Sequence, residues 1–139
     1  MESVVWEMNI KDARQQKTDG YHFKECVLNY VYLMNGYTIE HDADMEASIT
    51  IYNQDKLHQE IARTVLLYRE NLEGQEVRFF RSLLRLTQAQ LASKLAVERE
   101  TVLRWESEDN KHNIPKTADG LLRIIVWESY LDTPKGRAI

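Results

Sequence analysis

The stretch 88–106 constrains the fold of this chain more than any other, because its apolar residues fix two short helices and the break between them. Two helices that cross at roughly a right angle need a small residue where they touch and apolar residues around that contact. Ala92 supplies the small residue, and Thr87 can cap the first helix. The apolar positions that would close this small core are Leu91, Leu95, Val97, Val102 and Trp105. The spacing predicts a helix-turn-helix with helices at about 88–95 and 99–106.

Amphipathic helices are predicted on both sides of this motif. Upstream, apolar residues recur at spacings of three and four on one helical face, namely Leu57, Ile61, Val65, Tyr68 and Leu72. Asn53 or Asp55 can cap that helix. Glu73-Gly74 interrupts the pattern, a second helix covers about 77–86, and a closing helix is predicted at 117–131.

The N-terminal part has the pattern of strands. Residues 1–20 predict an arm with one short ordered piece. Residues 26–34 are β-branched and aromatic, and Asn35-Gly36 follows them, which predicts a hairpin with a return strand at 37–40. Residues 47–52 alternate between apolar and polar and predict a third strand. We therefore expect an α+β chain with a small N-terminal antiparallel sheet and a helix, followed by helices alone.

Charge separates the two halves of the chain. The formal net charge is −4, but residues 1–73 carry 7 Lys and Arg against 13 Asp and Glu. Residues 74–139 carry 11 against 9, so their balance is positive. Such asymmetry indicates different partners for the two halves. We predict an N-terminal region at 1–73 and a second domain at 74–139.

Composition excludes several classes of protein. The longest uncharged stretch, 26–39, is too short and too polar to cross a bilayer. The first residues have neither the basic start nor the apolar run of a secretory signal. A single cysteine, Cys26, excludes an internal disulfide framework and a zinc site with several thiolates. We expect an intracellular protein without a metal.

Two other groups of polar residues contain side chains that can bind metal ions. His22 and Cys26 are four residues apart, but no third or fourth metal ligand is evident, so we interpret them as ordinary sheet residues. The acidic run from Asp42 to Glu46 lacks the length and the glycine of a calcium loop and predicts an acidic turn. No catalytic arrangement and no glycine-rich phosphate loop is present. We expect neither an enzyme nor a bound cofactor.

The segments 78–92 and 101–106 resemble the Xre (Cro/C1-type) family of DNA-binding domains, and the likeness extends over about residues 74–131. The segments 72–81, 105–106 and 114–123 also resemble antitoxin-type regulators of the MqsA or YgiT kind. The resemblance implies a lambda-repressor-like helical domain after the sheet.

The chain departs from the family pattern at three places. The turn between the two helices has Ala96 where the family often has glycine, and alanine reaches a left-handed conformation only at a cost. The loop 107–113 is longer and more charged than usual. The paired thiols that bind zinc in MqsA are absent, so the resemblance implies no zinc site.

DNA-contacting residues follow from groove geometry, since the major groove admits one helix whose first residues reach base edges. The residues of that helix that point away from Val102 and Trp105 are Arg99, Glu100, Thr101 and Arg104. The candidates for phosphate contacts are Lys94, Arg81 and Arg85. By resemblance, Gln88 would contact a backbone phosphate or an outer base. The alternative is that these charges are solvated and pair with neighbouring glutamates.

The resemblance implies a cytoplasmic, sequence-specific transcriptional repressor. It also implies an antitoxin of a type II toxin–antitoxin system that represses its own operon and binds a basic toxin through residues 1–73. One alternative is a ligand-sensing Xre-family regulator with a small-molecule effector in the N-terminal region. Another is a protein-interaction module that no longer reads DNA.

A homodimer on a palindromic operator is also expected, because one recognition helix makes too few contacts to select a site in a genome. The closing helix has more apolar residues than one face against a helical core requires, namely Leu121, Leu122, Ile124, Ile125, Val126 and Trp127. The strand 26–34 is the other candidate dimer surface, since an exposed edge can pair with its copy.

Overall fold

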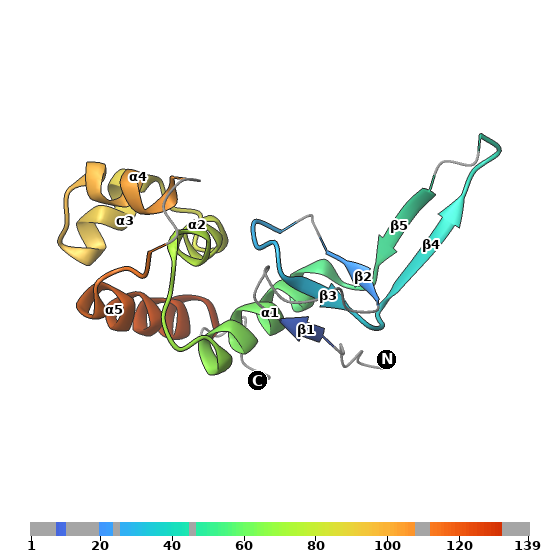
Figure 1. Ribbon diagram of the computed structural model, residues 1–139, viewed down its shortest axis with the longest axis horizontal. Coiled ribbons are helices and arrows are strands. Elements are labelled where there is room, and N and C mark those ends of the chain that lie inside the picture. The colour runs from blue at the N-terminus through green and yellow to red at the C-terminus, as the bar shows by residue number, and fades with distance from the viewer. Residues whose placement is uncertain (1–7, 11–19, 24–25, 45–46, 108–111, 132–139) are drawn as a thin grey trace. The chain divides into compact units, whose positions relative to one another are not determined.

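The protein is a mixed α+β chain with two small antiparallel sheets and five α-helices in the residues that the structure describes (Figure 1). The computed structural model describes residues 8–10, 20–23, 26–44, 47–107 and 112–131. The strands are β1 (Met8–Ile10), β2 (Tyr21–His22), β3 (Val31–Leu33), β4 (Tyr37–His41) and β5 (Ala47–Ile51). The helices are α1 (Gln54–Tyr68), α2 (Gly74–Leu83), α3 (Gln88–Leu95), α4 (Arg99–Glu106) and α5 (Lys116–Val126), which continues as a π-helical turn, η1 (Trp127–Leu131). The predicted α+β class is confirmed.

Two compact units make up the chain, and they divide between Ile61 and Ala62, so α1 runs through the division. Residues 62–73, which we assigned to the N-terminal region, are grouped with the second unit. Whether residues 74–139 form an independent domain stays a prediction. None of the described helices is long and apolar enough to cross a membrane.

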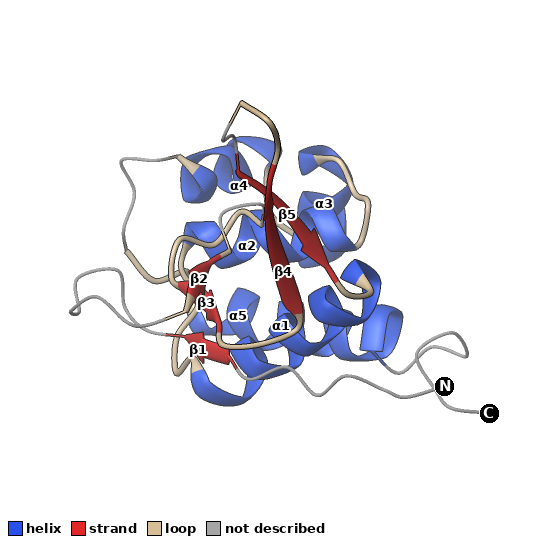
Figure 2. Ribbon diagram, turned by 90° about the vertical axis from the view of Figure 1, so that its right-hand side faces the viewer, coloured by secondary structure: helices blue, strands red, loops and turns tan. Residues whose placement is uncertain are grey.

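The strands pair differently from the predicted hairpin. β3 lies between β1 and β2, whereas β4 pairs with β5 in a separate two-stranded sheet, as the red strands of Figure 2 show. The hairpin predicted around Asn35-Gly36 is therefore wrong. Gly36, with φ 78°, leads the chain from one sheet to the other. The acidic loop joins the β4–β5 pair instead, and in it the Asp42 carboxylate accepts a hydrogen bond from the backbone N–H of Asp44 at 2.9 Å, a local turn typical of aspartate.

Within the first unit, the buried core comes from the segment around β3 and from the first part of α1. The fully buried side chains include Phe23, Leu28, Tyr30, Val31, Leu33, Leu57 and Ile61. Residues 26–30 are bent rather than extended, so the predicted strand 26–34 shortens to β3. Asn53 caps α1, since its side chain accepts a hydrogen bond from the Lys56 N–H at 3.3 Å.

The apolar face predicted for α1 is correct except at its end. Val65 is buried, but Tyr68 is 76% exposed and Leu72 is buried beyond the helix. Carbonyl groups at the end of α1 and just after it have a donor from another helix. Arg123 of α5 donates to the carbonyl oxygens of Leu66 and Arg69 at 3.0 and 2.7 Å, which satisfies groups that a helix terminus leaves unpaired.

A second polar contact holds the connection between α1 and α2. The Asp119 carboxylate accepts a hydrogen bond from the Leu72 N–H at 2.8 Å and forms an ion pair with Arg123. The Leu72 carbonyl accepts from the Ile114 N–H at 2.9 Å. Residues 72–73 are therefore tied to α5 and to the segment before it.

At Gly74 the backbone of α2 lies close to the backbone of α4. A Cβ atom at this position would overlap the backbone carbonyl oxygen of Trp105. Any side chain would have to push two helix backbones apart, so only glycine fits here. The break predicted at Glu73-Gly74 thus also provides a packing contact.

We predict that Gly74→Ala destabilises the protein by at least about 2 kcal/mol, because the added methyl group overlaps backbone rather than a movable side chain. Gly120→Ala is the matched control. Gly120 lies within α5 and a Cβ there would meet no atom within 4 Å, so alanine should stabilise by about 0.5–1 kcal/mol. Urea unfolding followed by circular dichroism measures both. Equal stabilities of the two variants would contradict the packing assignment.

A truncation tests the role of the connection. A fragment 54–139 keeps α1 and Leu72, whereas a fragment 74–139 loses Leu72, Val65 and the acceptors of Arg123. We predict that the shorter fragment is less stable by about 3 kcal/mol or more, since it loses buried apolar side chains and leaves Asp119 without its backbone donor. Thermal unfolding of the two fragments measures the difference. A fragment 74–139 that unfolds at the same temperature as 54–139 would show that the second domain begins at Gly74.

Candidate nucleic-acid interface

The α3–α4 pair has the bounds that the sequence predicted, 88–95 and 99–106. Its predicted core residues Leu91, Ala92, Leu95, Val102 and Trp105 are buried, whereas Val97 is half-buried. Thr87 caps α3 as expected. Its side chain accepts a hydrogen bond from the Gln90 N–H at 3.1 Å, and the Gln90 side chain accepts one from the Thr87 N–H at 2.8 Å. This reciprocal cap fixes the first turn of α3.

Ala96 sets the angle between the two helices. It has φ 57° and ψ 43°, in the left-handed region that glycine adopts more readily than alanine. Its N–H donates to the carbonyl oxygens of Ala92 and Ser93, and the Val97 N–H donates to Ala92 at 3.0 Å. These bonds end α3 and turn the chain into α4 within three residues.

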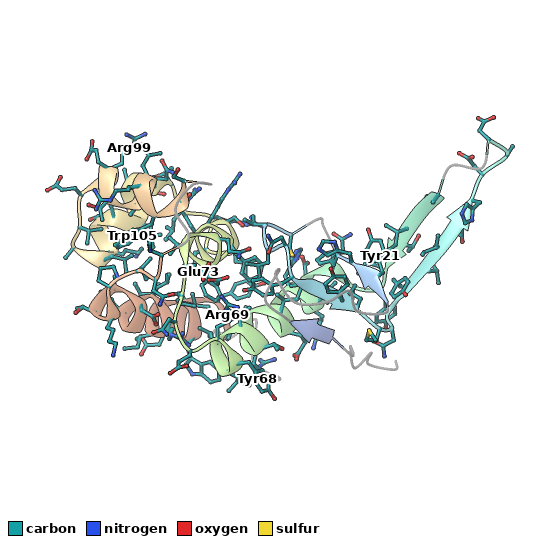
Figure 3. All side chains as sticks on the ribbon, in the orientation of Figure 1. Tyr21, Tyr68, Arg69, Glu73, Arg99 and Trp105 are labelled. Carbon is teal, nitrogen blue, oxygen red and sulfur yellow. The ribbon has the colours of Figure 1, made fainter. Side chains whose placement is uncertain are left out.

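The two faces of α4 differ sharply. Val102 is fully buried and Trp105 is 5% exposed, so both belong to the core. The opposite side is exposed, and we call it the outer face of α4; it consists of Arg99, Glu100, Leu103 and Arg104. Figure 3 shows Arg99 on the outside of the unit and Trp105 on the side toward α5. Thr101 is half-buried at the edge of the outer face.

Two further predicted residues lie on the surface near the ends of helices. Lys94 is exposed in the last turn of α3. Arg85 is exposed just after α2, with φ 57°, where its N–H donates to the Ser82 carbonyl oxygen at 3.1 Å. Both side chains are accessible to an anionic ligand.

Arg81 and Gln88 are instead engaged within the unit. Arg81 donates from Nε and one terminal nitrogen to the two carboxylate oxygens of Glu106, at 2.7 and 2.8 Å, and from its other terminal nitrogen to the Leu86 carbonyl at 3.1 Å. Gln88 donates to the same carboxylate at 3.3 Å. The hydrogen bond to Glu106 raises the pKa of Arg81. A single carboxylate thus joins residues of α2, α3 and α4.

Acidic residues stand at the start of α4. Glu98 is the first flanking residue and Glu100 lies in the first turn. A carboxylate at a helix N-terminus is favoured by the helix dipole, so both fit this end of α4. Near DNA they would repel phosphates and would need a hydrogen-bond donor such as the cytosine amino group. The start of α4 therefore carries negative as well as positive charge.

Leu103 is the residue of this face that sequence reasoning missed. It is 48% exposed, although it lies next to buried Val102. Its position, four residues after Arg99, could have placed it on the outer face. An apolar side chain on this face can contact the methyl group of thymine.

Metal-binding residues are not gathered in the described part of the chain, where no group of three or more His, Cys, Asp or Glu side chains could hold an ion. The buried Cys26 thiol contacts the carbonyl oxygens of Phe23 and Leu28 at 3.5 Å each. His22 shares a hydrogen bond of 2.8 Å with the Asn29 carbonyl and stacks on Tyr32 at 4.5 Å. The structure assigns these two side chains contacts of ordinary folding.

Known proteins add no constraint to this surface. No family model, no curated protein and no solved structure matches the chain.

We predict that Ala96→Gly stabilises the protein by about 1 kcal/mol, because glycine adopts φ 57° without the steric cost that alanine has there. Ala89→Gly, at an exposed position within α3, should destabilise it by up to about 1 kcal/mol. Chemical unfolding of the two variants gives both free energies. If Ala96→Gly were as destabilising as Ala89→Gly, the left-handed turn would be wrong.

Proposed function

We propose that this protein binds double-stranded DNA in a sequence-specific manner, with α4 lying in the major groove. The observation that carries the proposal is the outer face of α4. It presents two arginines, a glutamate and a leucine on one exposed side of a helix whose other side is anchored in the core. A single α-helix fits the major groove, where these side-chain types distinguish base pairs.

Each residue of the outer face has a role in the proposal. Arg99 would contact guanine through two hydrogen bonds, because it stands in the first turn of α4. Glu100 would accept a hydrogen bond from cytosine, and Thr101 and Leu103 would contact a thymine methyl group. Arg104 lies one turn further along and would contact a base or the backbone.

Phosphate contacts would come from the flanking helices. Lys94, in the last turn of α3, and Arg85, which follows α2, are exposed cations. In our proposal Arg81 is a positioning residue, because its guanidinium is already bound to Glu106 and to Leu86. Gln88 lies at the start of α3, where helix N–H groups bind anions, so a phosphate contact there would combine its amide with the helix end.

A regulatory role completes the proposal. A protein of this kind acts as a transcriptional repressor when it occupies a site that a polymerase needs. Its place in a toxin–antitoxin operon, with a basic toxin bound through acidic residues 1–73, rests on the sequence resemblance and on the charge difference between the halves. Co-purification tests that part, and we expect a basic protein encoded beside this chain to be recovered with it.

The DNA-binding test starts from a random-sequence duplex library, from which the full-length chain selects its own site. We predict that the selected duplex binds more tightly than a scrambled one, and that Arg99→Ala weakens the selected complex by about 1–3 kcal/mol and relaxes preference at one base pair. Fluorescence anisotropy at fixed salt measures both duplexes. If no sequence is enriched, or if Arg99→Ala binds both duplexes unchanged, the proposed base contact is rejected.

Lys94→Ala separates phosphate contact from base contact. We predict that it weakens binding to all duplexes alike and lowers the slope of log affinity against log salt by about one. Lys56→Ala is the control, because Lys56 is an exposed lysine of α1, in the first unit. A loss confined to the selected sequence, or an equal effect of Lys56→Ala, would contradict the role of Lys94.

A further inference from the structure

An apolar groove lies between the second half of α1 and the end of α5, within the second unit. It has a volume of about 340 Å³ and is lined by Leu66, Leu67, Ile124 and Trp127 together with three charged residues. Leu66 is half-buried, whereas Leu67, Ile124 and Trp127 are 70%, 55% and 48% exposed. Large exposed apolar side chains that gather at one place on a protein commonly mark an interaction site.

The two walls of the groove are fixed against each other by Arg123, one of the charged residues that line it. Its guanidinium donates to the carbonyl oxygens of Leu66 and Arg69 at 3.0 and 2.7 Å, and it forms an ion pair with Asp119. These contacts tie the end of α1 to α5. The groove is therefore formed before anything binds in it, as is usual for sites that take small molecules.

Charge in the groove is balanced. The lining has two arginines, Arg63 and Arg123, and one glutamate, Glu128. The charge of Arg123 is paired with Asp119, which lies outside the lining. Arg63 and Glu128 then contribute one charge of each sign, so the groove has no excess charge that would favour an anion or a cation. Burial of apolar surface is left as the main source of affinity.

The size of the groove favours a small molecule over a protein. Sites for small molecules have volumes of about 300–1,000 Å³, with mostly apolar and aromatic walls and few polar groups. A stable protein interface instead uses about 20–30 residues on each side, whereas seven residues line this groove. The indole of Trp127 adds an aromatic surface on which a second ring system can pack.

We propose that this groove binds a small, uncharged aromatic molecule between Leu67 of α1 and the Ile124 and Trp127 side chains at the end of α5. The bound molecule removes from water the apolar surface that these three side chains expose. Figure 3 shows Arg99 and Tyr68, the residue after Leu67, on opposite sides of the second unit, so the groove is separate from the outer face of α4. The inference goes beyond the proposed function, because it concerns a second ligand that binds in the absence of DNA.

An NMR titration of the full-length chain, without DNA, tests the site with three probes that share one ring system. They are 1-naphthylmethanol, which is uncharged, 1-naphthoate and 1-naphthylmethylammonium. We expect the alcohol to bind with a Kd of about 1 mM or below and to shift the amide resonances of residues 63–67 and 123–128. The two ions should bind at least about threefold more weakly, because each places a charge against apolar walls. An ion that binds as tightly as the alcohol would overturn the proposed ligand class.

Substitutions in the two walls test the location of the site. Leu67→Lys and Ile124→Lys should each weaken binding of the alcohol at least about fivefold, because each places a charge in the apolar groove. Both side chains are largely exposed, so circular dichroism and unfolding should match the unchanged protein. Leu103→Lys is the matched control, since Leu103 is 48% exposed on α4 and outside the groove. It should bind the alcohol as the unchanged protein does.

Three further results would overturn the proposal. The first is the absence of any shift when the alcohol is in large excess, and the second is an equal loss of binding in Leu103→Lys. The third is association of the chain with itself that covers residues 63–67 and 123–128 and excludes the alcohol, which would assign the groove to a protein. Each measurement is made without DNA, so failure of this site and failure of DNA binding can be told apart.

Discussion

The ion pair between Arg81 and Glu106 fixes the helices of the second unit around one carboxylate. Both oxygens of Glu106 are bound by Arg81, and Gln88 binds one of them as well. The Glu106 side chain is only 5% exposed, so removal of Arg81 would leave a nearly buried charge without its main partner. This contact also fixes the orientation of the outer face of α4, because Glu106 is the last residue of that helix.

A second polar cluster in this unit also fixes the positions of helices. Asp119 and Arg123, one turn apart on α5, bind the backbone of residues 66–72. Ion pairs of this kind contribute geometry more than stability, because the charges lose hydration when they are buried. Together with the close contact at Gly74, these ion pairs determine which helices can pack against one another. The apolar core contributes most of the stability of that packing.

Local patterns predicted the helices well and the strands poorly. Helix bounds at α3 and α4 followed from apolar spacing and from the cap at Thr87, both of which act within a few residues. The Asn35-Gly36 pair is also a local signal, but strand pairing depends on which distant segments are available. The sequence predicted that β4 would pair with β3. In the structure β3 pairs with β1 and β2 instead. For the candidate site, the apolar positions in the sequence predicted which face of α4 is buried and which is exposed. No sequence signal showed that Arg81 would be bound by Glu106. That contact joins residues 25 positions apart.

The π-helical turn at the end of α5 has a consequence for the evolution of this helix. A regular α-helix would carry Leu131 to the side opposite Leu122 and Val126, yet all three are buried. The wider turn of η1 uses more residues per revolution, so it brings Leu131 back to the inner side. Such a turn is equivalent to one inserted residue that the helix absorbs without a loop. A chain that lacked one residue between Val126 and Leu131 would form a continuous α-helix in the same phase, and its alignment with this protein would need a single-residue gap there.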